Sequence, residues 1–135
     1  MSDSKTCEIC GRTIHPLSYC CKRCKKLIER VDMRKKPDKK ARIQALKLAW
    51  DGEGFRCYYS GVRLVEENHR HPRYLTFDHR TPRQEEDVVI AAALLNDMKS
   101  DMTEDEFRAM IFQLASYFKG GTFDENAFNL KHWKR

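Results

Sequence analysis

The segment YLTFDHRTPRQEEDVVIAAALLNDMKSD, residues 74–101, decides the fold of this chain. It opens with a short extended run over residues 74–77, and the β-branched residues Val88 to Ile90 favour a second strand. An alanine- and leucine-rich stretch that favours a helix begins near Ala92. Two strands followed by a helix indicate a small mixed unit, so we expect an α+β fold.

Polar side chains stand at the ends of these predicted elements. Asp78 and His79 end the first strand, Asp87 precedes the second, and Asn96 lies on the helix. Carboxylate and amide oxygens are hard ligands that suit Mg²⁺ or Mn²⁺. An imidazole that is not a ligand can take a proton from water near neutral pH. A metal ion and a base beside a phosphodiester are the parts of a hydrolytic site.

These residues follow one another in a fixed order along the chain: Phe77-Asp78-His79, then Asp87-Val-Val-Ile, then Asn96-x-x-Lys99-Ser-Asp101. The order resembles the HNH endonuclease family, whose core is a ββα-metal fold. The upstream segment Cys57-Tyr-Tyr-Ser60-Gly61-Val62 is similar to the first hairpin of that family. The resemblance covers about residues 55–101.

The resemblance implies a role for each matching residue. Asp78 and Asn96 would bind a catalytic Mg²⁺ or Mn²⁺, and His79 would be the general base. Lys99 would either contact a phosphate or be a solvated charge on the helix. Asp87 stands where the family pattern has asparagine, and it would orient His79, cap the strand or become a ligand.

Many relatives hold this core with zinc on two cysteine pairs. Those positions here read Cys57-x-x-Ser60 and Ala92-x-x-Leu95-Asn96. We therefore expect apolar packing in place of that zinc and a buried thiol at Cys57.

A second metal site is indicated near the amino terminus, where two CxxC pairs are separated by ten residues: Cys7 with Cys10, and Cys21 with Cys24. Four thiolates on two tight turns suit a closed, structural zinc site. Cys20 is an alternative to Cys21, and His15 could substitute as a ligand, although a place in the turn suits it better. This zinc would hold structure and leave the chemistry to the second site.

Charge is distributed unevenly along the 135 residues, whose formal net charge is +6. Residues 1–54 hold 14 basic against 7 acidic side chains, whereas residues 84–121 hold 3 against 8. A basic front favours nucleic acid or another polyanion as partner. The candidate nucleic-acid contacts are Arg80, Arg83, Lys22 and Arg23.

We expect three regions along the chain. Residues 1–54 combine the zinc knuckle with basic helices over Cys21–Met33 and Asp38–Trp50. Residues 55–101 form the ββα-metal core, which begins with a strand–turn–strand over residues 55–65. Residues 102–135 form a capping helix and a tail.

A capping box, Thr103-Glu-Asp-Glu106, precedes the capping helix, which runs over Phe107–Phe118 and stops at Gly120-Gly121. We expect the Leu, Ile and Phe side chains of this helix in the core. We expect the aromatic side chains of the tail to dock on the body.

The sequence thus predicts a metal-dependent DNA endonuclease, a monomer or weak dimer that nicks one strand of a duplex per site. The competing prediction is a non-catalytic, zinc-stapled module that binds nucleic acid, and RNA is a further possible substrate. No apolar run approaches the ~20 residues of a membrane span, and no basic-then-apolar leader opens the chain. We therefore expect a cytoplasmic protein.

Overall fold

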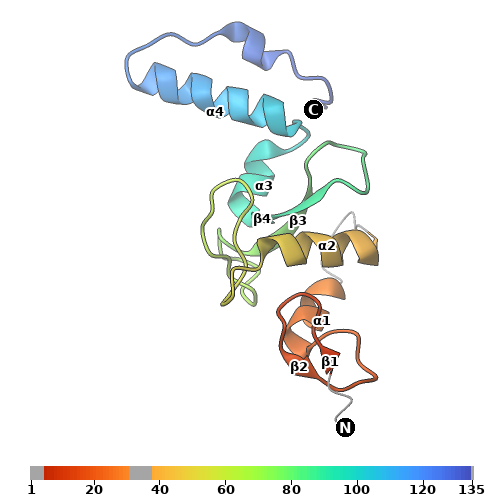
Figure 1. Cartoon of the computed structure of the whole chain (residues 1–135). Helices are drawn as coiled ribbons and strands as arrows, with labels where there is room; N and C mark the ends of the chain where they lie inside the picture. Colours follow the sequence, from red (N-terminus) through yellow and green to blue (C-terminus); the bar gives the residue numbers. More distant parts are fainter. Residues whose placement is uncertain (1–4, 31–37, 135) are drawn as a thin grey trace.

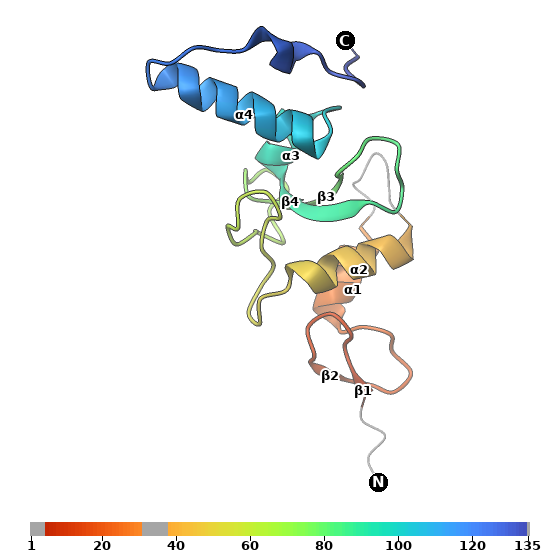
Figure 2. The same ribbon diagram turned by 45° about the horizontal axis from the view of Figure 1, so that its top comes forward.

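The computed structural model describes residues 5–30 and 38–134. Within them it combines helices with two small antiparallel sheets, which confirms the α+β class. The segment with the four clustered cysteines lies at one end of the molecule, the helix α4 and the tail lie at the other, and the β3–β4 hairpin lies between them (Figures 1 and 2). No helix within the described ranges is long and apolar enough to cross a membrane.

The amino-terminal part consists of strands β1 (Lys5–Thr6) and β2 (Thr13–Ile14) and helix α1 (Lys22–Ile28). The Cys21 sulfur caps α1 by accepting from the Cys24 N–H at 3.5 Å. Helix α1 ends at Ile28, earlier than the predicted Met33, which lies outside the described residues.

Helix α2 (Lys39–Ala49) begins where the sequence predicted, because the Asp38 side chain accepts from the Ala41 N–H at 2.8 Å and caps the first turn. Ala45 and Leu46 are buried on its inner face, and α2 packs against strand β4. The buried Arg42 guanidinium donates to the Ile28 carbonyl, which ties α2 to the end of α1.

Strands β3 (Leu75–His79) and β4 (Val88–Ala92) pair antiparallel, with Asp78 opposite Val89 and His79 opposite Val88. All of β4 is buried, as its unbroken apolar sequence requires. Helix α3 (Ala93–Lys99) follows β4 without a loop. The predicted order of strand, strand and helix is therefore present.

The segment 55–65 forms a hairpin with isolated bridges in place of continuous strands. Arg56 bridges to Arg63, and the Cys57 N–H donates to the Val62 carbonyl at 2.9 Å. Gly61 has a φ of 73°, so the turn needs glycine there. The Cys57 thiol is buried and accepts from the Ala92 N–H at 3.4 Å, which joins this hairpin to β4.

One core joins the amino-terminal part to the central hairpin. Its fully buried apolar side chains come from α1, α2, the 55–65 hairpin, β3 and β4, and include Ile28, Leu46, Phe55, Leu75 and Ile90.

Helix α4 (Glu104–Phe118) has the predicted capping box and ends before Gly120, whose φ is 90°. The expectation that its apolar side chains lie in the core is wrong. Phe107 is only 5% exposed, but Phe112 is 72% and Phe118 78% exposed. Only the first turn of α4 reaches the body, because the rest of the helix extends beyond α3 (Figure 2).

The tail folds back along α4 through a short 3-10 helix, η1 (Glu125–Phe128), and does not dock on the body. The Asp124 N–H donates to Gln113 at 2.8 Å and the Lys131 N–H to Glu106 at 2.8 Å. Phe128 and Trp133 remain mostly exposed, so the predicted docking of the tail aromatic residues is wrong as well.

Candidate functional site

The first candidate site is a cluster of four cysteines, whose ligand atoms all lie within 4.8 Å of one another: Cys7, Cys10, Cys21 and Cys24. The Cys10 and Cys21 sulfurs are 3.6 Å apart. Four thiolates at the usual zinc–sulfur distance of ~2.3 Å are about 3.8 Å apart in a tetrahedron. The cluster could therefore hold a zinc ion.

The backbone around Cys7 favours a thiolate at that position, whereas burial raises the pKa of Cys10 and of Cys24. Burial acts to raise the pKa of Cys7, but N–H groups of Cys10, Cys21 and Ile9 outweigh it and lower the pKa to about 6. Cys20 lies outside the cluster, and burial raises its pKa to about 12.

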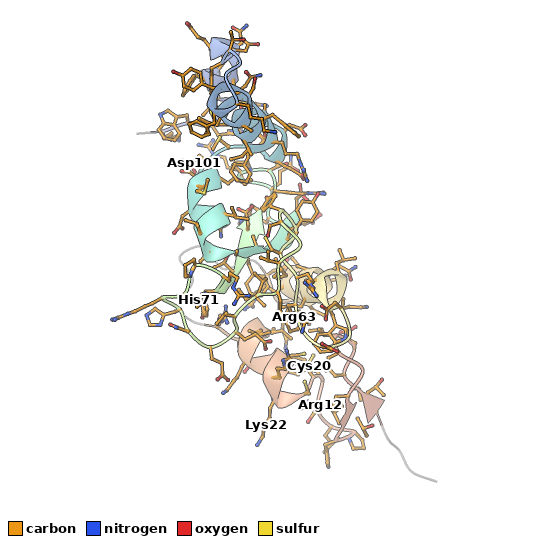
Figure 3. The ribbon with its side chains drawn as sticks, turned by 90° about the vertical axis from the view of Figure 1, so that its left-hand side faces the viewer. Arg12, Cys20, Lys22, Arg63, His71 and Asp101 are labelled. Carbon is orange, nitrogen blue, oxygen red and sulfur yellow. The ribbon has the colours of Figure 1, made fainter. Side chains whose placement is uncertain are left out.

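His15 is a turn residue. Its Nδ1 accepts from the Leu17 N–H at 3.1 Å, within the loop that separates the two cysteine pairs. The labelled Cys20 and Lys22 mark this end of the molecule in Figure 3.

The second candidate site lies where β3 meets α3. Successive strand residues face opposite sides, so Thr76 and Asp78 lie on one face of β3, and both contact residues of α3. Asp78 is 6% exposed. Its Oδ2 accepts from the Tyr59 hydroxyl at 2.5 Å and lies 3.4 Å from the Lys99 Nζ.

Burial is the main influence on the pKa of Asp78 and raises it, while Tyr59, Lys99 and His79 act to lower it. Burial likewise raises the pKa of Tyr59, so its phenol keeps its proton and donates. Oδ2 therefore has two donors. Within the described part of the chain, no donor contacts Oδ1.

The orientation of the Asn96 amide follows from one hydroxyl proton. The Thr76 Oγ1 donates to the Ala91 carbonyl across the hairpin at 2.7 Å. Because its one proton is donated to Ala91, the Thr76 hydroxyl can only accept from the Asn96 Nδ2, which lies 3.1 Å away. The same Nδ2 lies 3.5 Å from the Phe77 carbonyl. The Asn96 Oδ1 is therefore turned away from Thr76, and no donor among the described residues contacts it.

His79 is half-buried at the end of β3. Its backbone carbonyl accepts from the Lys99 Nζ at 2.9 Å. In the part of the chain that the structure describes, its imidazole has no hydrogen-bond partner.

Lys99 has neither of the two roles expected for it. Its side chain is 1% exposed, which contradicts both a solvated charge and a direct phosphate contact. The ammonium group instead joins Asp78 to the backbone of His79. It fixes the end of β3, which carries both residues.

Asp87 closes the loop that follows His79. Its Oδ1 accepts from Arg80 through Nε at 2.7 Å and lies 2.6 Å from Nη2, while its Oδ2 accepts from the Thr81 hydroxyl at 3.2 Å. Its carbonyl also accepts from the Arg80 N–H at 2.8 Å. These contacts hold the loop that begins after His79, and among the described residues none of them joins Asp87 to the His79 ring.

The four candidate nucleic-acid contacts lie in different surroundings. Arg23 is a structural side chain, contrary to expectation, because it donates to Glu66 at 2.8 and 2.5 Å and lies over the Trp50 ring. The guanidinium group of Arg80 is paired with Asp87 through Nε and Nη2. Lys22 and Arg83 are exposed, Lys22 at the start of α1 and Arg83 in the loop between β3 and β4.

Sequence reasoning missed Tyr59, which donates to an oxygen of Asp78, and Thr76, which accepts from the amide nitrogen of Asn96. Tyr59 lies in the 55–65 hairpin, 19 residues before its partner, so no local pattern links the two. Thr76 had a signal, because strand alternation places it on the face of Asp78.

Comparisons of this chain with protein-family models, with curated proteins and with solved structures found no match.

Proposed function

We propose that the chain is a divalent-metal-dependent DNA endonuclease of the HNH type, with β3, β4 and α3 as a ββα-metal core. One observation carries the proposal. The protein holds the buried Asp78 by one carboxylate oxygen and the neighbouring Asn96 by its amide nitrogen, and each of the two side chains keeps one oxygen without a donor among the described residues.

This donor set fits a hard cation. Asp78 Oδ1 and Asn96 Oδ1 would hold Mg²⁺ or Mn²⁺, which keep several waters and need few protein ligands. A dication there would neutralise charge that develops on the scissile phosphate and on the leaving oxygen. Partners that fix ligand orientation are typical of metal sites, and both residues have them.

His79 would take the proton from the attacking water. Its ring is not engaged by a described side chain, and Lys99 holds its backbone in place. Asp87 and Arg80 would keep the following loop closed. The described residues hold one such site per chain, so a monomer would nick one strand.

A plasmid assay tests the proposal. Zinc-loaded protein with Mg²⁺ or Mn²⁺ should convert supercoiled plasmid to the relaxed form, and EDTA should stop the conversion. His79→Ala should lower the rate by ~10²–10⁴-fold, whereas His69→Ala, an exposed loop histidine, should leave it unchanged. Full activity of the His79 variant would end the proposed mechanism.

Ligand variants extend the same assay. Asp78→Asn and Asn96→Ala should lose activity through lost metal binding. Asp97→Asn removes an exposed carboxylate beside Asn96 and is the matched control.

The second candidate is a non-catalytic, zinc-stapled module that binds nucleic acid. The ion pair between Asp78 and Lys99 favours it, because the carboxylate already has a counter-charge without a dication. A module of this kind would retard DNA in a gel and leave the plasmid intact with or without EDTA.

A further inference from the structure

Tyr59 connects the 55–65 hairpin to the end of β3. Its ring packs edge-on against Tyr58 and Phe107, with centroids 5.1 and 5.6 Å away. Both contacts fix the ring, and the ring fixes its hydroxyl 2.5 Å from Asp78 Oδ2. The place of this hydroxyl therefore depends on the hairpin and on α4.

A carboxylate has two equivalent oxygens, and rotation of the group exchanges them. The Lys99 ammonium has three donors in a flexible arrangement and lies 3.4 Å from Oδ2, so it can follow either oxygen. A phenol has one directional donor. The shorter contact from Tyr59 therefore selects which oxygen turns toward the hairpin.

We propose that Tyr59 is a positioning residue that holds the Asp78 carboxylate by Oδ2 and so presents Oδ1 to the divalent cation. This inference rests on the proposed function, since it assigns the cation to Asp78. Tyr59 touches neither the cation nor the substrate. It acts through the orientation of one ligand.

The direct test is the affinity of the zinc-loaded full chain for Mn²⁺, measured from the electron paramagnetic resonance signal of free Mn²⁺. Tyr59→Phe should weaken Mn²⁺ binding by ~10-fold, the size of effect that loss of a ligand's hydrogen-bonding partner typically has. Tyr58→Phe is the matched control, because the Tyr58 hydroxyl bonds Glu104 instead. Its Mn²⁺ affinity should stay within about twofold of wild type.

Plasmid nicking should separate the Tyr59→Phe and Tyr58→Phe variants in the same way as Mn²⁺ binding does. The Mn²⁺ concentration for half-maximal plasmid nicking should rise by the same factor in Tyr59→Phe, and the rate at saturating Mn²⁺ should recover. A general loss of structure would lower the saturated rate and the zinc content instead.

A measurement on the wild-type chain keeps the inference testable should the variant not fold. Tyrosine labelled with ¹³C at Cζ reports the hydrogen bond of each phenol, and Mg²⁺ should shift the resonance of Tyr59 and leave that of Tyr58 in place. An unshifted Tyr59 resonance at saturating Mg²⁺ would overturn the inference.

Failure of the two proposals looks different. If Mn²⁺ binding is the same in wild type and in Asp78→Asn, the proposed function is wrong. If binding depends on Asp78 but Tyr59→Phe binds as tightly as wild type, only the role of Tyr59 is wrong.

Discussion

Replacing Lys99 by methionine should destabilise the protein through Asp78. The methionine fills similar volume but removes the ammonium that contacts Asp78 Oδ2 at 3.4 Å and the His79 carbonyl at 2.9 Å. Asp78 would keep only Tyr59 as a donor, in a place where its side chain is 7% exposed. A buried carboxylate without its counter-charge is costly, so the group would take a proton.

The free energy needed to protonate Asp78 sets how far the free energy of unfolding should fall. The ordinary pKa of the group is 3.8, and each pH unit above it costs about 1.4 kcal/mol. The free energy of unfolding should therefore fall by at most about 4 kcal/mol at pH 7 and about 2 kcal/mol at pH 5. The sign follows from the raised pKa of Asp78: the folded state binds the proton more tightly than the unfolded state, so stability is lost as the pH rises.

Urea unfolding at pH 5 and pH 7, with Zn²⁺ added to every sample, measures both losses in the free energy of unfolding. Asp78→Asn should also destabilise, because it leaves the ammonium unpaired, and the double variant Lys99→Met/Asp78→Asn should be more stable than Lys99→Met at pH 7. The reasoning is refuted if the deficit of Lys99→Met is equal at the two pH values, or if the double variant shows no recovery.

Three other expectations concern the rest of the chain. Cys24→Ser should lose zinc, whereas Cys20→Ser should retain one zinc per chain by metal analysis, because Cys20 lies outside the cluster. Asp51→Asn should be less stable than wild type at pH 7 and should lose that deficit in acid titrations as the pH falls below 3.8, because two backbone N–H groups of its turn and two arginines lower the pKa of the carboxyl. Phe107→Ala should lower the free energy of unfolding by ~3–5 kcal/mol, whereas Phe112→Ala, at a mostly exposed site, should change it by less than about 0.5 kcal/mol. Equal losses at the two phenylalanines would contradict the burial described for α4.

Local signals in the sequence predicted local structure. Asp38 and Thr103 begin helices because each side chain accepts from an N–H group only three residues away. The β-branched run before α3 marked a strand for the same local reason. The four cysteines were found because CxxC spacing alone brings two sulfurs together.

Long-range pairing could not be predicted in this way. Arg23 bonds Glu66, which lies 43 residues later in the sequence, and Tyr59 bonds Asp78, which lies 19 residues later. Lys99 is buried and its ammonium group contacts Asp78 and His79 of β3, about 20 residues earlier in the chain, so the helix sequence alone made it look solvated. The apolar pattern of α4 is the same whether a partner surface covers it or not, which is why its exposure was missed.

The chain of hydrogen bonds from Ala91 through Thr76 to Asn96 has a consequence for how the site matures during biosynthesis. The orientation of the Asn96 amide is fixed only after the two strands have paired, because the Thr76 hydroxyl donates to the Ala91 carbonyl only in the paired hairpin. Under the proposed function, a half-synthesised polypeptide would not bind cellular Mg²⁺ at this site. The chain would become able to cleave DNA only when the β3–β4 hairpin has formed.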